Sequence, residues 1–309
     1  MSTVANPPVV VADEVADALR ERRGVVALET TIVVHGLPHP TNLEVARRCE
    51  DAVRASGSVP ATIGVLDGKL VVGLSATQLE RLAEPSRESA KLSARDLGVA
   101  LATARDGATT VAATIAAAHW AGISVMATGG LGGVHRDAAS SFDESADLTA
   151  LSRTPVLVVA SGVKSILDIG ATLERLDSLG VPVLGYRTSR FPGFYLHDSG
   201  FGVDWRVEDA HDAARAFVLH REFSPTGVLL ANPVTAQRQL DARLHDDALT
   251  SAFDVARRAR VTGKDVTPVL LAEFARFTAG RSVRVNEDLV VANAELAGRV
   301  ARYVAPALA

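Results

Sequence analysis

The chain has 309 residues, 48% of them hydrophobic, and a net charge of −4. We expect a single domain over residues 1–309 with a loose N-terminal arm over 1–10, and the mild acidity disfavours nucleic acid or an anionic membrane as a partner. The lone Cys49 excludes a disulfide framework, and neither a signal peptide nor a membrane-length apolar stretch stands out, so we expect a cytoplasmic protein.

Short apolar runs and helical patterns fill the first third of the chain. They predict a buried strand over 25–29, a helix over 41–57, and a hairpin over 61–75 that turns at Asp67-Gly68. Thr41 with Glu44 has the spacing of a capping box at a helix start, and Ser75 with Gln78 repeats it.

The alternation becomes more regular in the middle of the chain. The predicted elements are a helix over 109–122, strands over 123–128 and 156–160, a helix over 164–180, a strand over 181–187, a helix over 205–223 and a strand over 226–232. The chain after Asn232 is nearly all helical in pattern. The sequence therefore predicts an α/β protein with a largely parallel central sheet and a mostly helical C-terminal part.

Polar and glycine residues follow three of these strands. Glu29 ends the first strand, Thr128-Gly129-Gly130 ends the strand over 123–128, and Lys164 comes shortly after the strand over 156–160. Ligands of open parallel sheets bind outside the carboxyl ends of the strands. We therefore expect the functional site at this edge.

Lys164 and Glu29 are the strongest candidates for chemistry. Lys164 is predicted at a helix start, where positive charge is disfavoured, and this favours the neutral amine that attacks a carbonyl carbon. Glu29 follows an apolar strand, and apolar surroundings raise the pKa of a carboxyl group until it can serve as a proton donor. A solvent-facing lysine and a turn-capping glutamate are the simpler alternatives.

Other segments offer weaker binding signals. Glycine turns at 107–110 and 128–135 can present backbone amides to an anion, although such turns often serve only steric needs. The acids around Asp143 suit a hard cation that keeps several waters, or they belong to a helix start capped by Ser145. Lys91 can contact a phosphate or be a solvated helix lysine. The histidines lack zinc-ligand spacing, and Walker A and G-x-G-x-x-G patterns are missing.

Several long strings, in order, carry a family resemblance. They include ALETTIVVHGLPHPTNLEVA, PATIGVLDGKLVVGLS, GATTVAATIAAAHWAGI, TGGLGGVHR, ESADLTAL and GVKSILDIGATLERL. Between about Gly24 and about Ala297 the chain resembles pseudouridine-5'-phosphate glycosidases. The resemblance implies a three-layer α/β/α fold, a homotrimer, and reversible cleavage of pseudouridine 5'-phosphate to uracil and ribose 5-phosphate through a lysine imine with the ribose C1.

The resemblance also implies a role for each matching residue. Lys164 matches the family's nucleophile, Glu29 its proton donor and Asp143 its manganese ligand. The positions that match substrate-binding or pocket-lining residues are Lys91, Val111, Ser145, Ala146, Asp147, His135 and Asn286.

Two alternatives remain at this level. The family's PAFY reads PGFY at residues 192–195, and one of its terminal asparagines is Ala292, so the side that recognises the base departs from the pattern. A relative that joins ribose 5-phosphate to an aromatic natural-product aglycone would keep Glu29 and Lys164 and differ there. The other alternative is a non-catalytic sugar-phosphate binder, which needs no amine placed at C1.

Overall fold

The computed structural model describes residues 8–84, 89–261 and 266–308. It contains an 11-stranded sheet whose main path runs β1-β4-β3-β2-β7-β8-β11-β9-β10. The strands are β1 (Val9–Val11), β2 (Val25–Leu28), β3 (Val59–Leu66), β4 (Lys69–Val72), β5 (Ala90–Leu92), β6 (Gly107–Thr109), β7 (Val125–Ala127), β8 (Leu157–Ala160), β9 (Val183–Tyr186), β10 (Trp205–Val207) and β11 (Val228–Ala231). The path from β3 to β10 is parallel throughout, whereas β4 and β6 pair antiparallel with β3.

The helices lie between and after these strands. They are α1 (Asp13–Arg20), α2 (Thr41–Ala55), α3 (Ala76–Ala83), α4 (Leu97–Ala102), α5 (Val111–Trp120), α6 (Ala138–Ser141), α7 (Ala146–Arg153), α8 (Ile169–Ser178), α9 (Ala210–Arg221), α10 (Ala242–Ala259), α11 (Val266–Phe277) and α12 (Arg281–Ala307). Two short turns, the π-helical η1 (Ile32–Gly36) and the 3-10 η2 (Ala94–Asp96), complete the set. No helix in the described ranges is long and apolar enough to cross a membrane.

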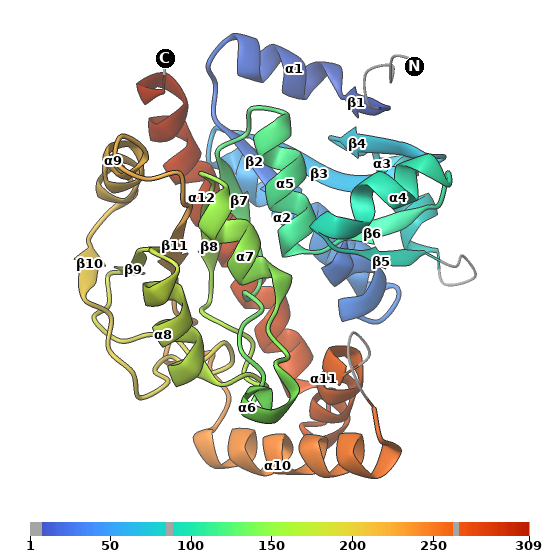
Figure 1. Cartoon of the computed structure of the whole chain (residues 1–309), viewed down its shortest axis with the longest axis vertical. Coiled ribbons are helices and arrows are strands. Elements are labelled where there is room, and N and C mark those ends of the chain that lie inside the picture. Colours follow the sequence, from blue (N-terminus) through green and yellow to red (C-terminus); the bar gives the residue numbers. More distant parts are fainter. Residues whose placement is uncertain (1–7, 85–88, 262–265, 309) are drawn as a thin grey trace.

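Helices cover both faces of the sheet and make three layers (Figure 1). The long α12 packs on β2, β7 and β8 and against α2 and α9, whereas α5 packs on β2 and β7 from the other side and contacts α7. The central strands β2, β3, β8 and β11 are buried at every residue, because they are covered on both faces. The predicted three-layer fold with a largely parallel sheet is confirmed.

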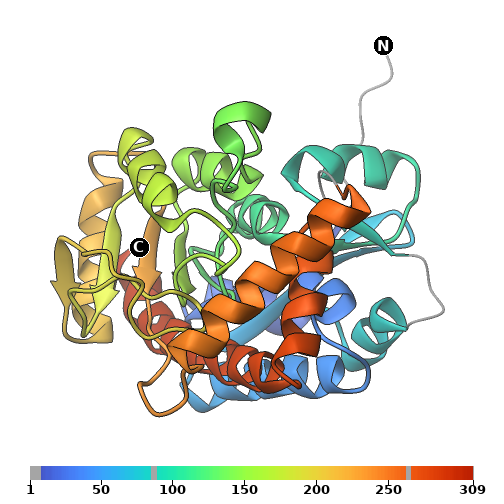
Figure 2. The same ribbon diagram turned by 90° about the horizontal axis from the view of Figure 1, so that it is seen from below.

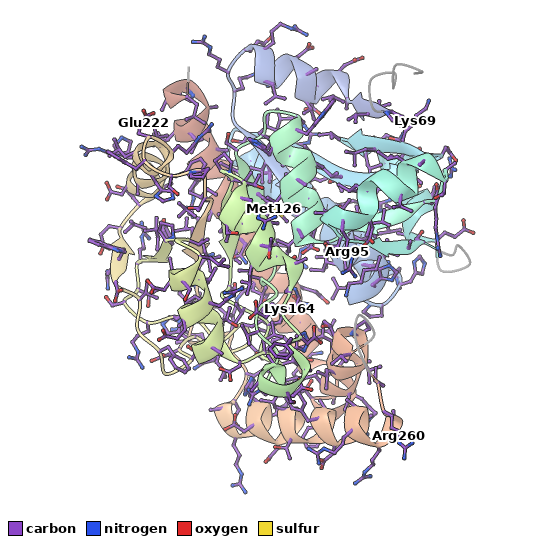
Figure 3. All side chains as sticks on the ribbon, in the orientation of Figure 1. Lys69, Arg95, Met126, Lys164, Glu222 and Arg260 are labelled. Carbon is purple, nitrogen blue, oxygen red and sulfur yellow. The ribbon has the colours of Figure 1, made fainter. Side chains whose placement is uncertain are left out.

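Helices α10 and α11 lie apart from the helices that cover the two faces of the sheet. Figure 2, seen from below, shows α10 and α11 over the end of the sheet, with α2 and α12 along one face. This is the end to which β2, β7 and β8 point their carboxyl ends. In Figure 3, Met126 lies within β7, and Lys164 lies beyond it toward α10. The site that follows the strand ends therefore lies between the sheet and the α10–α11 pair.

Most predicted elements are found, with local corrections. The hairpin of β3 and β4 forms, and Ser75 and Gln78 make the predicted capping box. The prediction of a capping box at Thr41 is wrong. Thr41 is already the first residue of α2, and the N-cap residue Pro40 makes no side-chain capping hydrogen bond. The loose arm is wrong for Val9 and Val10, which pair with β4 in β1, and residues 1–7 of that arm lie outside the described residues.

Two helix starts differ from the sequence prediction. Residues 205–207 form the edge strand β10, and α9 starts only at Ala210 after the side-chain cap of Asp209. Lys164 is not at a helix start, because α8 begins at Ile169, where Asp168 caps it. The helix-start argument for Lys164 is therefore wrong, and its surroundings must come from tertiary contacts.

Candidate active site

A cavity of about 340 Å³ lies at the carboxyl ends of β2, β7 and β8. Every residue predicted for the site lines it: Glu29, Lys91, Val111, His135, Asp143, Ser145, Ala146, Asp147, Lys164 and Asn286. Thr267, Pro268 and Leu271 close its outer side from α11. The cavity thus joins residues from segments that are far apart in sequence.

Glu29 lies at the floor of this cavity, directly after β2. It is 9% exposed, and one of its carboxylate oxygens accepts a hydrogen bond from the Thr128 hydroxyl at the end of the neighbouring β7. Burial raises the pKa of Glu29, although the nearby Lys164 cation and the Thr128 hydrogen bond oppose the increase. A raised pKa favours the protonated form that a proton donor needs, and the turn-capping alternative is not found.

Lys164 reaches the same floor from the loop after β8. Its Nζ donates a hydrogen bond of 2.7 Å to the Gly130 carbonyl, and its backbone N–H donates to the Leu131 carbonyl. The next residue, Ser165, donates from its hydroxyl to the Gly193 carbonyl at 2.7 Å. The lysine is half-buried and points into the cavity, so the simpler alternative of a solvent-facing lysine is wrong.

Two glycines let these loops approach one another. Gly162 has a φ of +76°, and a Cβ atom there would lie 2.2 Å from the Pro192 carbonyl oxygen. A Cβ atom on Gly132 would lie 2.2 Å from the Ser145 hydroxyl oxygen. Only glycine fits at either position, which explains the glycine-rich turns after β7 and β8.

The starts of α5 and α7 form one wall of the cavity. Thr110 caps α5 and Ser145 caps α7, so the predicted N-cap role of Ser145 is found. Val111 and Ala146 are the first residues of the two helices, and both line the cavity. Helix starts expose amide N–H groups and carry partial positive charge, so this wall suits a phosphate or another anion.

Asp147 connects this wall to the glycine loop. It is 6% exposed, and its two carboxylate oxygens accept hydrogen bonds of 2.9 Å from the amides of Ala112 and Gly132. The carboxylate thereby fixes the start of α5 against the loop after β7. Both oxygens of Asp147 therefore have protein partners, and the amides of Ala112 and Gly132 are occupied by them.

Asp143 and His135 lie at the cavity wall above the helix starts. The Asp143 carboxylate is 3.9 Å from His135 Nδ1, and its side chain is 37% exposed. A single exposed carboxylate suits a hard cation that keeps most of its waters. The one three-residue cluster with metal-ligand spacing in the described ranges is elsewhere, at Asp209, His211 and Asp212. That cluster is exposed at the start of α9, where the helix dipole disfavours a cation.

The back of the cavity is formed by α12. Asn286 is 6% exposed, and its Oδ1 is a buried acceptor without a hydrogen-bond partner among the described residues. Further along α12, Asn293 donates a hydrogen bond from Nδ2 to the Thr128 carbonyl at 2.8 Å, and its Oδ1 accepts one from Asn232. Asn293 thus holds the end of β7 in place, whereas the amide oxygen of Asn286 remains available to a ligand.

Sequence reasoning assigned no role to two further residues of the cavity, Thr31 and His35. Within the part of the chain that the structure describes, both have a buried polar atom without a hydrogen-bond partner, Thr31 Oγ1 and His35 Nε2. Their place in the string ETTIVVHG, directly after Glu29, was the available signal. Lys91 lies in strand β5 and is half-buried, so the alternative of a solvated helix lysine is wrong.

Comparison with known proteins shows which family this chain resembles. The profile of the indigoidine synthase A-like proteins matches residues 14–303. The chain is 59% identical to a pseudouridine-5'-phosphate glycosidase of Salinispora tropica, over 93% of this chain and 89% of that protein. A relative of the same name from Streptomyces griseus is 52% identical, with 95% and 91% covered.

Solved structures agree in fold. The prealnumycin C-glycosynthase AlnA, solved in complex with ribulose 5-phosphate, superposes with a TM-score of 0.90 at 40% identity, over 98% of each chain. An indigoidine synthase A-like protein from Thermotoga maritima gives a TM-score of 0.89 at 33% identity, over 99% of each chain. The chain therefore belongs to the pseudouridine-5'-phosphate glycosidase family, within the indigoidine synthase A-like proteins.

Proposed function

We propose that this protein is a pseudouridine-5'-phosphate glycosidase that reversibly cleaves its substrate to uracil and ribose 5-phosphate. The observation that carries the proposal is the pair at the cavity floor: a buried carboxyl group with a raised pKa, Glu29, beside the lysine amine of Lys164. The names of relatives that are up to 59% identical over nearly the whole chain support the same reaction.

The proposed chemistry follows from the bond that is broken. A C–C glycosidic bond has no leaving oxygen to protonate, so a pair of carboxylates does not suffice. The Lys164 amine bonds to C1 as the bond from C1 to the ring oxygen breaks, and the proton that the amine nitrogen loses goes to that oxygen. Protonation of the uracil carbon by Glu29 then lets the C1–carbon bond break, its electron pair staying with uracil while the lysine nitrogen forms an imine at C1. Water hydrolyses the imine and releases ribose 5-phosphate.

The remaining residues bind the two ends of the substrate in this proposal. The phosphate lies at the starts of α5 and α7, against the amides of Val111 and Ala146 and near Lys91. The helix starts that carry these amides are fixed by neighbouring bonds: Asp147 accepts from the amides of Ala112 and Gly132, and the Ser145 hydroxyl accepts from the Asp147 amide. Uracil lies toward Asn286, whose unpaired Oδ1 can accept a hydrogen bond from a ring N–H. His135 lies between the glycine loop and Asp143.

A divalent cation belongs to the proposal as well. Asp143 would hold it, with His135 nearby, and a bound Mn²⁺ would neutralise phosphate charge. We further propose that the chain acts as one domain within a cytoplasmic homotrimer, as the family resemblance implies. Light scattering of the purified protein tests the trimer, and loss of activity on chelation with recovery on Mn²⁺ addition tests the metal.

A second candidate function has one specific observation in its favour. The prealnumycin C-glycosynthase shares the fold at 40% identity, and it bound ribulose 5-phosphate. A synthase that attaches a sugar phosphate to an aromatic aglycone would use the same Glu29 and Lys164. The glycosidase is the better supported of the two, because the relatives of that name are more similar to this chain.

The decisive experiment is a product assay on the purified protein. Pseudouridine 5'-phosphate with Mn²⁺ should yield uracil with the wild type and none with Lys164→Ala. If the folded wild type releases no uracil, borohydride trapping with ribose 5-phosphate separates the other possibilities. An adduct on Lys164 would then support the synthase, whereas no adduct would leave only a binder.

A further inference from the structure

His35 lines the cavity, yet the proposed mechanism gives it no part. It lies in η1, a single π-helical turn that begins three residues after Glu29. Single π-helical turns occur frequently at functional sites. The turn places His35 on the same side of the cavity as Lys91, whose charge acts on both His35 and Glu29. His35 therefore lines the same cavity as Glu29, Lys91 and Lys164.

The surroundings of the ring define which nitrogen carries the proton. Burial and the Lys91 charge lower the pKa of His35, so the imidazole is neutral at pH 7. The Ala90 backbone opposes this lowering of the pKa, and among the described residues Nε2 is a buried ring nitrogen without a partner. We assign the ring proton to Nδ1, because a carbonyl that raises the pKa of a histidine faces an N–H and Nε2 faces none. In a neutral imidazole the other nitrogen then carries the lone pair, so Nε2 is an acceptor only.

A buried acceptor without a partner calls for a donor from a ligand. A phosphate offers oxygen acceptors and does not match Nε2, whereas the starts of α5 and α7 offer phosphate the donors it needs. The unpaired Oδ1 of Asn286 lies on α12, away from η1 in the sequence and on a different wall. Thr31, in the turn with His35, adds a hydroxyl that is also unpaired. The hydroxyl groups of the sugar are donors that suit this wall.

We propose that His35 Nε2 accepts a hydrogen bond from the C2 or C3 hydroxyl of the ribose, and that this contact selects ribose 5-phosphate over deoxy sugars. The inference rests on the proposed function, because it takes a ribose phosphate as the ligand. It makes His35 a specificity residue, and Thr31 completes the same hydroxyl-binding wall.

Direct binding tests this separately from catalysis. The dissociation constants of ribose 5-phosphate, 2-deoxyribose 5-phosphate and 3-deoxyribose 5-phosphate are measured by calorimetry for wild type, His35→Phe and His35→Gln. Glutamine keeps an acceptor near the position of Nε2, and phenylalanine removes it. His119→Phe, an exposed histidine on α5 outside the cavity, is the matched control. Thermal unfolding checks that each variant is folded.

The expected result is selective. His35→Phe should weaken ribose 5-phosphate binding about 10-fold or more, and His35→Gln should stay within about threefold of wild type. Against the deoxy sugar that lacks the contacted hydroxyl, His35→Phe and wild type should bind equally. An equal penalty on all three sugars, or none on any, overturns the inference. If the wild type binds ribose 5-phosphate but releases no uracil, the proposed function fails while the His35 inference is still decided.

Discussion

The strand ends and the helix starts of the cavity use acidic side chains in opposite ways. At the end of β2, Glu29 is buried with one hydroxyl partner, and its pKa is raised. At the start of α7, Asp147 is equally buried, but both its oxygens accept backbone hydrogen bonds. Burial by itself therefore does not decide what a carboxyl group does. The number of donors around it decides whether it gives up a proton or fixes the backbone.

The two sides of the site are therefore expected to have different roles. The strand ends and the loops after them hold the groups proposed to form and break bonds, Glu29 and Lys164, and burial raises the pKa of Glu29. The helix starts hold amide donors whose positions are fixed by Asp147 and Ser145. Substitutions on the strand-end side should therefore abolish turnover and leave the fold intact, whereas those on the helix-start side should affect stability and binding together.

The largest effect is expected for Lys164→Ala. Loss of the nucleophile should reduce uracil release by about 10⁴-fold or more, because the other lysine of the cavity, Lys91, is proposed to contact the phosphate and not C1. Unfolding temperature should change little. Lys69→Ala, at an exposed position of β4, is the control and should retain full activity. A Lys164→Ala enzyme with undiminished activity would sink the mechanism.

Glu29→Gln should come next. The amide keeps the size of the side chain but cannot donate the acidic proton, so kcat should fall by about 10² to 10⁴-fold. Borohydride trapping of ribose 5-phosphate on Lys164 should still be possible, because the amine is unchanged. Retained turnover together with normal trapping would remove Glu29 from the proton-transfer step.

Asp147→Asn probes the helix-start side. One of the amides of Ala112 and Gly132 would then face an NH₂ group instead of an oxygen, leaving a buried donor unpaired. We expect a loss of about 1–3 kcal/mol in unfolding free energy and a higher KM for the phosphorylated substrate. Chemical denaturation and steady-state kinetics measure both. A loss of kcat alone would contradict the positioning role.

The raised pKa of Glu29 predicts a pH dependence of stability. The folded protein keeps the proton that the unfolded chain releases above a pH of about 4.3, so this carboxyl group favours unfolding increasingly as pH rises through its folded pKa. Glu29→Gln has no such proton. Its unfolding temperature relative to wild type should therefore rise between pH 5 and pH 8, and a constant difference over that range would argue against the raised pKa.

The smallest effect is expected far from the cavity. Ser75→Ala removes the side-chain acceptor of the α3 capping box, which should cost about 1 kcal/mol of stability. Activity per folded molecule should not change, because α3 contributes no residue to the cavity lining. A decrease in kcat would show that turnover also depends on stability outside the strand ends and helix starts that line the cavity.

Local sequence signals predicted much of this architecture. The apolar runs of β2, β7 and β8 and the residues that follow them were found, because burial and strand ends appear in the order of the residues themselves. The helix start at Lys164 was placed too early. The loop after β8 donates hydrogen bonds to the carbonyls of Leu131 and Gly193, which are distant in sequence. No local pattern therefore predicts that α8 begins only at Ile169.

The sequence by itself determined the α/β class, the family and the residues proposed for the reaction, because these depend on residue order and on long matching strings. The tertiary structure decided which polar atoms have partners. It showed that both carboxylate oxygens of Asp147 accept hydrogen bonds from backbone amides. It also showed that His35 Nε2 and Asn286 Oδ1 have no hydrogen-bond partner among the described residues. The physical reason is that protonation and hydrogen bonding depend on burial and on donors supplied by other segments. That environment exists only once β2, β7, α7 and α12 have come together.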